Sequence, residues 1–179
     1  DVLTTQMETL KIYDTYHAKA QYATQIKGNR PHIGTASFHL IEARHPALQK
    51  DVVPITVYLT KAQHGLFISG SNTGGKTVTL KTIGLLHVMA QAGLFIPASE
   101  HSSIMLFDHI LADIGDQQSI EHNLSTFSSH LKKHQSMLAV ANEHTLLLID
   151  EIGSGTDPQE GVAIAQALLE AYEDKQANF

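Results

Sequence analysis

A glycine-rich segment in the middle of the chain has the composition of a phosphate-binding loop. Residues 70–77 read GSNTGGKT, which satisfies the pattern G-x-x-x-x-G-K-[ST] in full. Glycines let several backbone N–H groups point at a phosphate, and a helix that begins at Lys76 adds the positive end of its dipole. Lys76 is expected to reach the β- and γ-phosphate oxygens, and the Thr77 hydroxyl to bind Mg²⁺. The sequence therefore predicts ATP or ADP as ligand, with a chance match as the alternative. The predicted nucleotide-binding residues are Gly70, Ser71, Asn72, Thr73, Gly74, Gly75, Lys76, Thr77 and Val78.

Two carboxylates follow an apolar run further along the chain. Residues 146–149 read LLLI and lead directly into Asp150 and Glu151. A strand buried on both faces has such a sequence, and ligands of open α/β sheets collect at its carboxyl end. We expect Asp150 to hold Mg²⁺, directly or through water, and Glu151 to orient and deprotonate the attacking water. By itself such a pair can also be a simple cap. With the phosphate loop upstream, it favours ATP hydrolysis over phosphate transfer by a small-molecule kinase.

Helical signals are found at both ends of the chain and directly after the loop. Apolar residues recur at steps of three and four from Val2 to Lys27, which predicts one long helix. Gly28 is expected to end it in the left-handed conformation, before Pro31. A helix of about 16 residues should begin at Lys76 and end before Gly93. Further helices are predicted at about 125–142 and from Pro158, the latter with Asp157 as N-cap, Pro158 at N1 and Glu160 at N3.

Short β-prone runs lie between these helices, at 35–41, 52–59, 66–69, 104–107 and 145–149. Strands that alternate with helices are typical of a largely parallel α/β sheet with helices on both faces. The predicted fold is therefore an α/β domain with a mostly parallel sheet, preceded by a long N-terminal helix.

Composition excludes several classes of protein. The chain of 179 residues has no cysteine, 18 acidic residues against 12 Lys and Arg, and a formal net charge of −6. Neither a disulfide framework nor a thiolate zinc site is possible, and a cytoplasmic, non-membrane protein is expected. The scattered basic residues offer little electrostatic footprint for nucleic acid. His130 and His134 have the spacing of two metal ligands on one helix face, but without a visible third ligand we expect packed or solvated histidines.

Three ordered segments resemble one family. They are ISGSNTGGKTVTLKTIGLLHVMAQAGLFIPA at 68–98, ADIGDQQSIEHNLSTFSSH at 112–130 and DEIGSGTDPQEG at 150–161. Together they closely resemble the ATPase domain of the MutS family, and most of all its type-2 branch, whose members carry a C-terminal Smr nuclease domain. The resemblance covers nearly the whole chain from Ala43 onward.

The resemblance implies a P-loop NTPase of the ABC-ATPase class that works as a homodimer. Two such heads close around two nucleotides, and a signature segment of each completes the other's site. Ser125 begins the matching segment and is expected to act in trans on the γ-phosphate. Asn72 would help to position that phosphate or the water. Gly153–Asp157 matches the loop through which heads communicate, and Asp113–Asp116 matches the Q-loop-like connection.

The resemblance also implies a division into residues 1–30, the end of a helical core or lever region, and residues 31–179, the ATPase domain. The second part stops before the last strand and switch histidine of the family. Branched or mismatched DNA, or the ribosome, would be bound by regions outside this segment. A mismatch-repair member is one alternative, and a head that binds nucleotide only to dimerise is another. Val52 and Val53 stand where mismatch-repair members often have an aromatic ring over adenine, which leaves base selectivity open.

Overall fold

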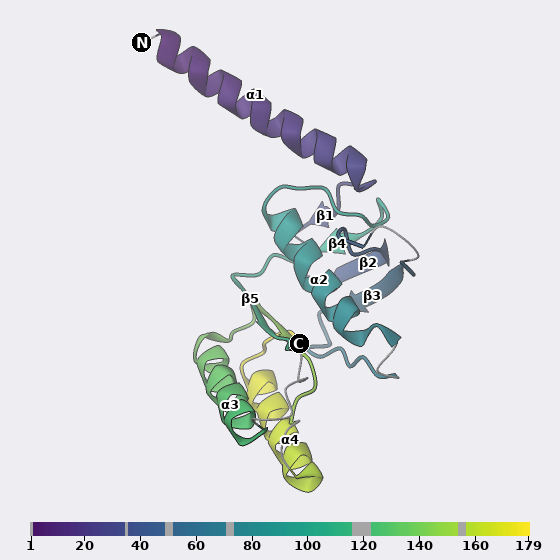
Figure 1. Cartoon of the computed structure of the whole chain (residues 1–179), viewed down its shortest axis with the longest axis vertical. Helices are drawn as coiled ribbons and strands as arrows, with labels where there is room; N and C mark the ends of the chain where they lie inside the picture. Colours follow the sequence, from purple (N-terminus) through teal and green to yellow (C-terminus); the bar gives the residue numbers. More distant parts are fainter. Residues whose placement is uncertain (1, 35, 49–51, 71–73, 116–122, 154–156) are drawn as a thin grey trace. The chain divides into compact units, whose positions relative to one another are not determined.

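The computed structural model describes residues 2–34, 36–48, 52–70, 74–115, 123–153 and 157–179, and of residues 123–127 it describes the backbone alone. Figure 1 shows its helices and strands, coloured along the sequence. They are α1 (Val2–Gln25), β1 (His32–Ile33), β2 (Phe38–Ala43), β3 (Ile55–Leu59), α2 (Lys76–Gln91), β4 (Ser103–Ile104), β5 (His109–Asp113), α3 (Asn123–Val140), β6 (Thr145–Ile149) and α4 (Pro158–Asp174).

The chain divides into two compact units. The first contains Asp1–Tyr58 and Leu85–Met105, and the second contains Leu59–Gly84 and Leu106–Phe179. Helix α2 contributes its first residues to the second unit and its last residues to the first. The predicted division into residues 1–30 and 31–179 concerns the domains of a whole protein and stays a prediction.

A mixed four-stranded sheet forms the centre of the first unit. Its order is β1-β4-β2-β3, with β4 parallel to β1 and antiparallel to β2. In the first half of β2, Phe38 and Leu40 are buried and His39 between them is exposed, as expected for a strand with one face on a core. The ring of Phe38 meets the ring of His87 edge to face at 4.8 Å, so the sheet packs on the second half of α2.

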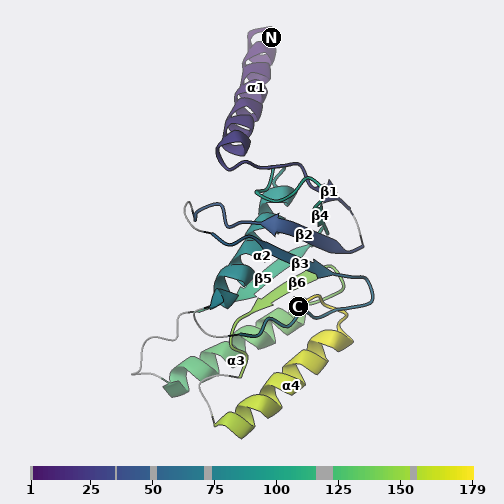
Figure 2. The same ribbon diagram turned by 90° about the vertical axis from the view of Figure 1, so that its right-hand side faces the viewer.

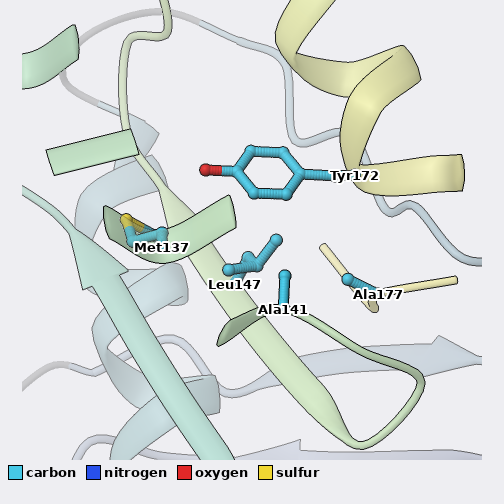
Figure 3. Close-up of a cluster of buried hydrophobic side chains, with 5 residues drawn as sticks. All are labelled: Met137, Ala141, Leu147, Tyr172 and Ala177. Carbon is cyan, nitrogen blue, oxygen red and sulfur yellow. The ribbon is translucent and has the colours of Figure 1, made fainter. Parts of the chain in front are cut away.

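The second unit is built on two parallel strands, β5 and β6, whose register runs from His109 opposite Thr145 to Asp113 opposite Ile149. The segment that connects these two strands contains α3, so it is long enough for the crossover that parallel strands require. Helices α3 and α4 lie side by side against this pair (Figure 2). The core between them contains Met137, Ala141, Leu147, Tyr172 and Ala177 (Figure 3).

The predicted sheet is wrong. Instead of one mostly parallel sheet of the P-loop, ABC-ATPase class, the described residues form a mixed four-stranded sheet and a separate parallel pair. The reason lies in the connections: β1, β2 and β3 follow one another with no helix between them, so nothing there imposes a parallel crossover. The run 66–69 is not a strand, whereas β5, which was not predicted, is one.

Predictions that depend on local sequence signals, such as helix ends, agree better with the structure. The helix predicted from Lys76 spans Lys76–Gln91, the predicted strand spans Thr145–Ile149, and Asp157 caps the helix that begins at Pro158. The end of α1 differs in one detail. Lys27 takes the left-handed conformation (φ 52°), and the Gly28 N–H then bonds the Ala23 carbonyl at 2.8 Å. Within the described ranges, no helix is long and apolar enough to cross a bilayer.

Candidate functional site

The described part of the glycine-rich loop has the backbone that its sequence requires. Gly70 and Gly75 have φ values of 151° and 77°, which other residues adopt only with strain. Lys76 is the first residue of α2, and its ammonium donates a hydrogen bond to the Gly70 carbonyl at 2.8 Å. This bond closes the two ends of the loop around the side chain expected to meet a phosphate. Ser71, Asn72 and Thr73 lie outside the described residues.

The two motifs meet at Thr77 and Asp150. The Thr77 hydroxyl donates to Asp150 Oδ2 at 2.5 Å, although the two residues are 73 positions apart. Asp150 directly follows β6, whose first four residues are buried, and Thr77 lies in the first turn of α2. A hydroxyl and a carboxylate so close together are the hard oxygen donors that Mg²⁺ prefers. The donor set at this position therefore suits a magnesium ion.

Glu151 stands beside this pair in a strained conformation. Its φ of 54° places a residue other than glycine in the left-handed region, and its side chain is exposed. Lys76, Asp150 and Glu151 line one hollow of about 310 Å³, whose other walls are mostly apolar. The residues predicted to bind phosphate, metal and water thus share one cavity.

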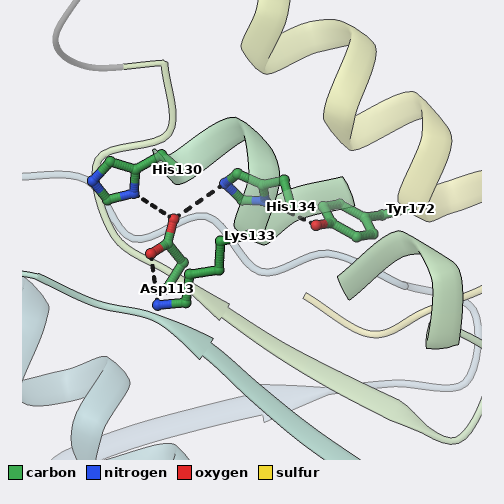
Figure 4. Close-up of polar contacts among 5 residues, drawn as sticks. All are labelled: Asp113, His130, Lys133, His134 and Tyr172. Atoms are coloured by element: carbon green, nitrogen blue, oxygen red, sulfur yellow. Dashed lines mark hydrogen bonds and ion pairs between the residues drawn. The ribbon is translucent and has the colours of Figure 1, made fainter. Parts of the chain in front are cut away.

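An unpredicted polar network adjoins this site (Figure 4). The Asp113 carboxylate, 4% exposed at the end of β5, is contacted by three side chains of α3. His130 Nδ1 lies 2.7 Å from Oδ2, His134 Nε2 lies 3.3 Å from the same oxygen, and Lys133 donates to Oδ1 at 2.9 Å. On its other side, His134 Nδ1 lies 2.8 Å from the Tyr172 hydroxyl of α4. One buried carboxylate therefore ties β5 to α3 and, through His134, to α4.

The network has a definite protonation pattern. Burial by itself would raise the pKa of Asp113, but hydrogen bonds and charge from His130 and Lys133 lower that pKa below its ordinary value. Burial lowers the pKa of His134, so this ring is neutral near pH 7. Burial, and then the charge of Asp113, raise the pKa of Tyr172 to about 12. Tyr172 thus donates its proton to His134 Nδ1, and the Nε2–H of His134 faces Asp113.

The sequence indicated that His130 and His134 share one face of a helix. It did not predict Asp113 as their partner. The Asp113 carboxylate lies beside both imidazole rings. One carboxylate and two histidines are side chains of the kinds that bind metal ions. The Lys133 ammonium occupies the second carboxylate oxygen, however, and none of the described His, Asp and Glu side chains form a group arranged to hold a metal ion. One sequence signal could have indicated Asp113 as this partner. It is a carboxylate at the end of a strand, followed by a helix with the pattern His-x-x-x-His.

Comparison with known proteins places this site in a family. The family model described as MutS domain V matches residues 66–179, more than half of the chain and all of the site. The chain belongs to the MutS family. Relatives named Endonuclease MutS2 are 51% identical over 172 residues in Pediococcus pentosaceus, 52% over 168 in Listeria welshimeri and 51% over 166 in Shouchella clausii. Their shared name belongs to the type-2 branch that the three sequence segments resemble.

The chain spans only part of these MutS relatives. The alignments cover 95%, 93% and 92% of the chain but 22%, 21% and 21% of the three relatives. Within the MutS match, the structure brings Lys76, Thr77, Asp150 and Glu151 together. Val78 follows on the same helix and is 41% exposed. The Ser125 backbone belongs to α3, but its side chain lies outside the described set, so its role in trans stays a prediction.

Proposed function

We propose that this MutS-family chain binds ATP or ADP with Mg²⁺ and hydrolyses ATP. The observation that carries the proposal is the contact between Thr77 Oγ1 and Asp150 Oδ2 at 2.5 Å, which joins the loop motif to the carboxylate motif. Gly70–Val78 would hold the phosphates, with the Lys76 ammonium on the β- and γ-phosphate oxygens. Thr77 and Asp150 would hold Mg²⁺, which when bound neutralises developing charge on the phosphates.

Glu151 is the proposed general base. Glu151 lines the same cavity as Lys76 and Asp150. Its carboxylate would orient a water molecule there and accept a proton from it. The left-handed backbone at this residue fits a role in chemistry, since such strain collects at functional positions.

For the whole protein we propose a homodimer in which Ser125 of each protomer completes the other's site. Nucleotide binding and hydrolysis would drive a clamp that acts on branched or mismatched DNA or on the ribosome through regions outside this segment. The resemblance to the type-2 branch and the relatives' name support this proposal, and the name also makes nuclease activity an expectation for the complete protein.

The substitution Thr77→Val tests the magnesium assignment. It removes the hydroxyl but keeps the shape of the side chain, so affinity for ADP should fall about tenfold when Mg²⁺ is present, in line with the loss of a hydrogen bond to a charged group. With EDTA the affinity should stay unchanged. Isothermal titration calorimetry measures both values. Thr79→Val, two residues along the same helix, removes the same group elsewhere and should keep the full effect of Mg²⁺. Equal magnesium dependence in Thr77→Val and Thr79→Val would contradict the assignment.

A further inference from the structure

The Asp113 network and the proposed magnesium site share a backbone connection. The Asp150 N–H donates to the Asp113 carbonyl at 2.9 Å, one position beyond the pairing of Asp113 with Ile149. The backbone of Asp113 is thus the neighbour that holds the backbone of Asp150 at the end of the two strands. Thr77 contacts the Asp150 carboxylate. A shift of the Asp113 backbone would therefore move Asp150 relative to Thr77, the other proposed magnesium ligand.

The side chain of Asp113 is in turn held by one helix. His130 lies one turn of α3 before the adjacent residues Lys133 and His134, and each of the three presents a nitrogen to the same carboxylate. Such a buried carboxylate is costly to move, because another position would leave it without these partners. Residues on both sides also line one small cavity of about 10 Å³, among them Asp113, His134, Asp150 and Glu151. Because residues of the network and of the site line the same cavity, the network directly adjoins the site. The volume is about the space of a single water molecule.

We infer that Asp113 is a positioning residue for the magnesium ligand Asp150, with its side chain anchored by α3 and its carbonyl anchoring the Asp150 backbone. This inference rests on the proposed binding of magnesium nucleotide. Groups that orient metal ligands from behind typically change metal affinity by about tenfold to a hundredfold when they are removed. Asp113 does not touch the nucleotide in this arrangement. It determines where Asp150 stands.

The test measures how much Mg²⁺ strengthens ADP binding, as the ratio of affinities with Mg²⁺ and with EDTA. The Asp113→Asn amide cannot pair with Lys133 as a carboxylate does, so this ratio should fall about tenfold. Affinity in EDTA should stay unchanged, because the phosphate loop is intact. Loss of packing alone would lower thermal stability without changing the ratio, which separates positioning from a merely structural role.

Lys133→Met and Lys132→Met form a matched pair on α3. Lys133 pairs with Asp113 while 47% of its side chain is exposed, so its removal should leave the fold intact and lower the ratio about twofold to threefold. Lys132 is its exposed neighbour, and Lys132→Met should keep the ratio of the original chain. Circular dichroism and thermal unfolding verify that each variant is folded.

The outcomes distinguish the inference from the function on which it rests. A folded Asp113→Asn chain with the original ratio would overturn the inference while leaving magnesium nucleotide binding in place. Should Asp113→Asn fail to fold, Lys133→Met decides, and a ratio equal to that of Lys132→Met would overturn the inference. If the original chain binds no nucleotide at all, the proposed function fails and the inference fails with it.

Discussion

A hydroxyl from the start of α2 and a carboxylate from the end of β6 meet at 2.5 Å, and this contact defines the site at the scale of residues. The types of both residues follow from the chemistry, since hard oxygen donors suit Mg²⁺. That the two residues belong to one site could be predicted from two short motifs, and their contact agrees with it. The polar network around Asp113 was not predicted, because its partners His130 and Lys133 are 17 and 20 positions away and meet it only in the folded chain.

His134 makes stability depend on pH. Its folded pKa lies below the ordinary value of 6.5, so the unfolded chain binds a proton at a higher pH than the folded chain does. The free energy of unfolding should therefore fall as the pH is lowered from about 7 to about 5. Urea unfolding at a series of pH values measures this slope.

His134→Gln should be less stable near pH 7 yet show a shallower slope, because the buried titrating group is gone. His101→Gln is the control, since 77% of the His101 side chain is exposed, and it should keep the original slope. A slope in His134→Gln as steep as that in His101→Gln would contradict the neutral, buried state assigned to His134.

At the scale of elements, a close approach of α2 to β6 supports the site. A Cβ atom at Gly84 would overlap Leu148 Cδ1, so the glycine lets the helix lie close to the buried strand. Because Thr77 belongs to α2 and Asp150 follows β6, this packing helps to hold the two proposed magnesium ligands at their distance. A glycine inside a helix otherwise costs about 1 kcal/mol relative to alanine.

Gly84→Ala should lower the free energy of unfolding by about 1 kcal/mol, because overlap with Leu148 outweighs the better helix propensity. In a chain that already carries Leu148→Ala, the overlapping atom is absent, and the same substitution should become stabilising. Chemical denaturation of the four chains in this cycle measures the coupling between the two positions. Gly84→Ala that stabilises the original chain would contradict the packing described here.

Local and non-local structure differed in how well they could be predicted. The ends of α2 and α4 depend on caps, glycines and apolar periodicity within a few residues, and these were read correctly. Strand pairing depends on segments far apart in the chain. Strand β4, only Ser103–Ile104, lies between β1 and β2, a placement that no local pattern indicates. The grouping of Lys76, Asp150 and Glu151 could therefore be expected from the sequence while the sheets could not, because the motifs are short and continuous.

At the scale of the whole molecule, the chain belongs to the MutS family. It matches about a fifth of the length of its curated relatives, and Lys76, Thr77, Asp150 and Glu151 lie within the residues that match MutS domain V. The chemistry proposed for the site can thus be tested on this chain alone. Action on a nucleic acid is a proposal for the complete protein.

The most direct test of the account is a calorimetric titration of the folded chain with ADP and Mg²⁺. We predict saturable heat for the original chain and its loss in Lys76→Ala, because the ammonium that closes the loop onto Gly70 is also the proposed phosphate ligand. A well-folded original chain that gives no heat, or a Lys76→Ala chain that binds with the original affinity, would contradict the claim that this loop holds a nucleotide.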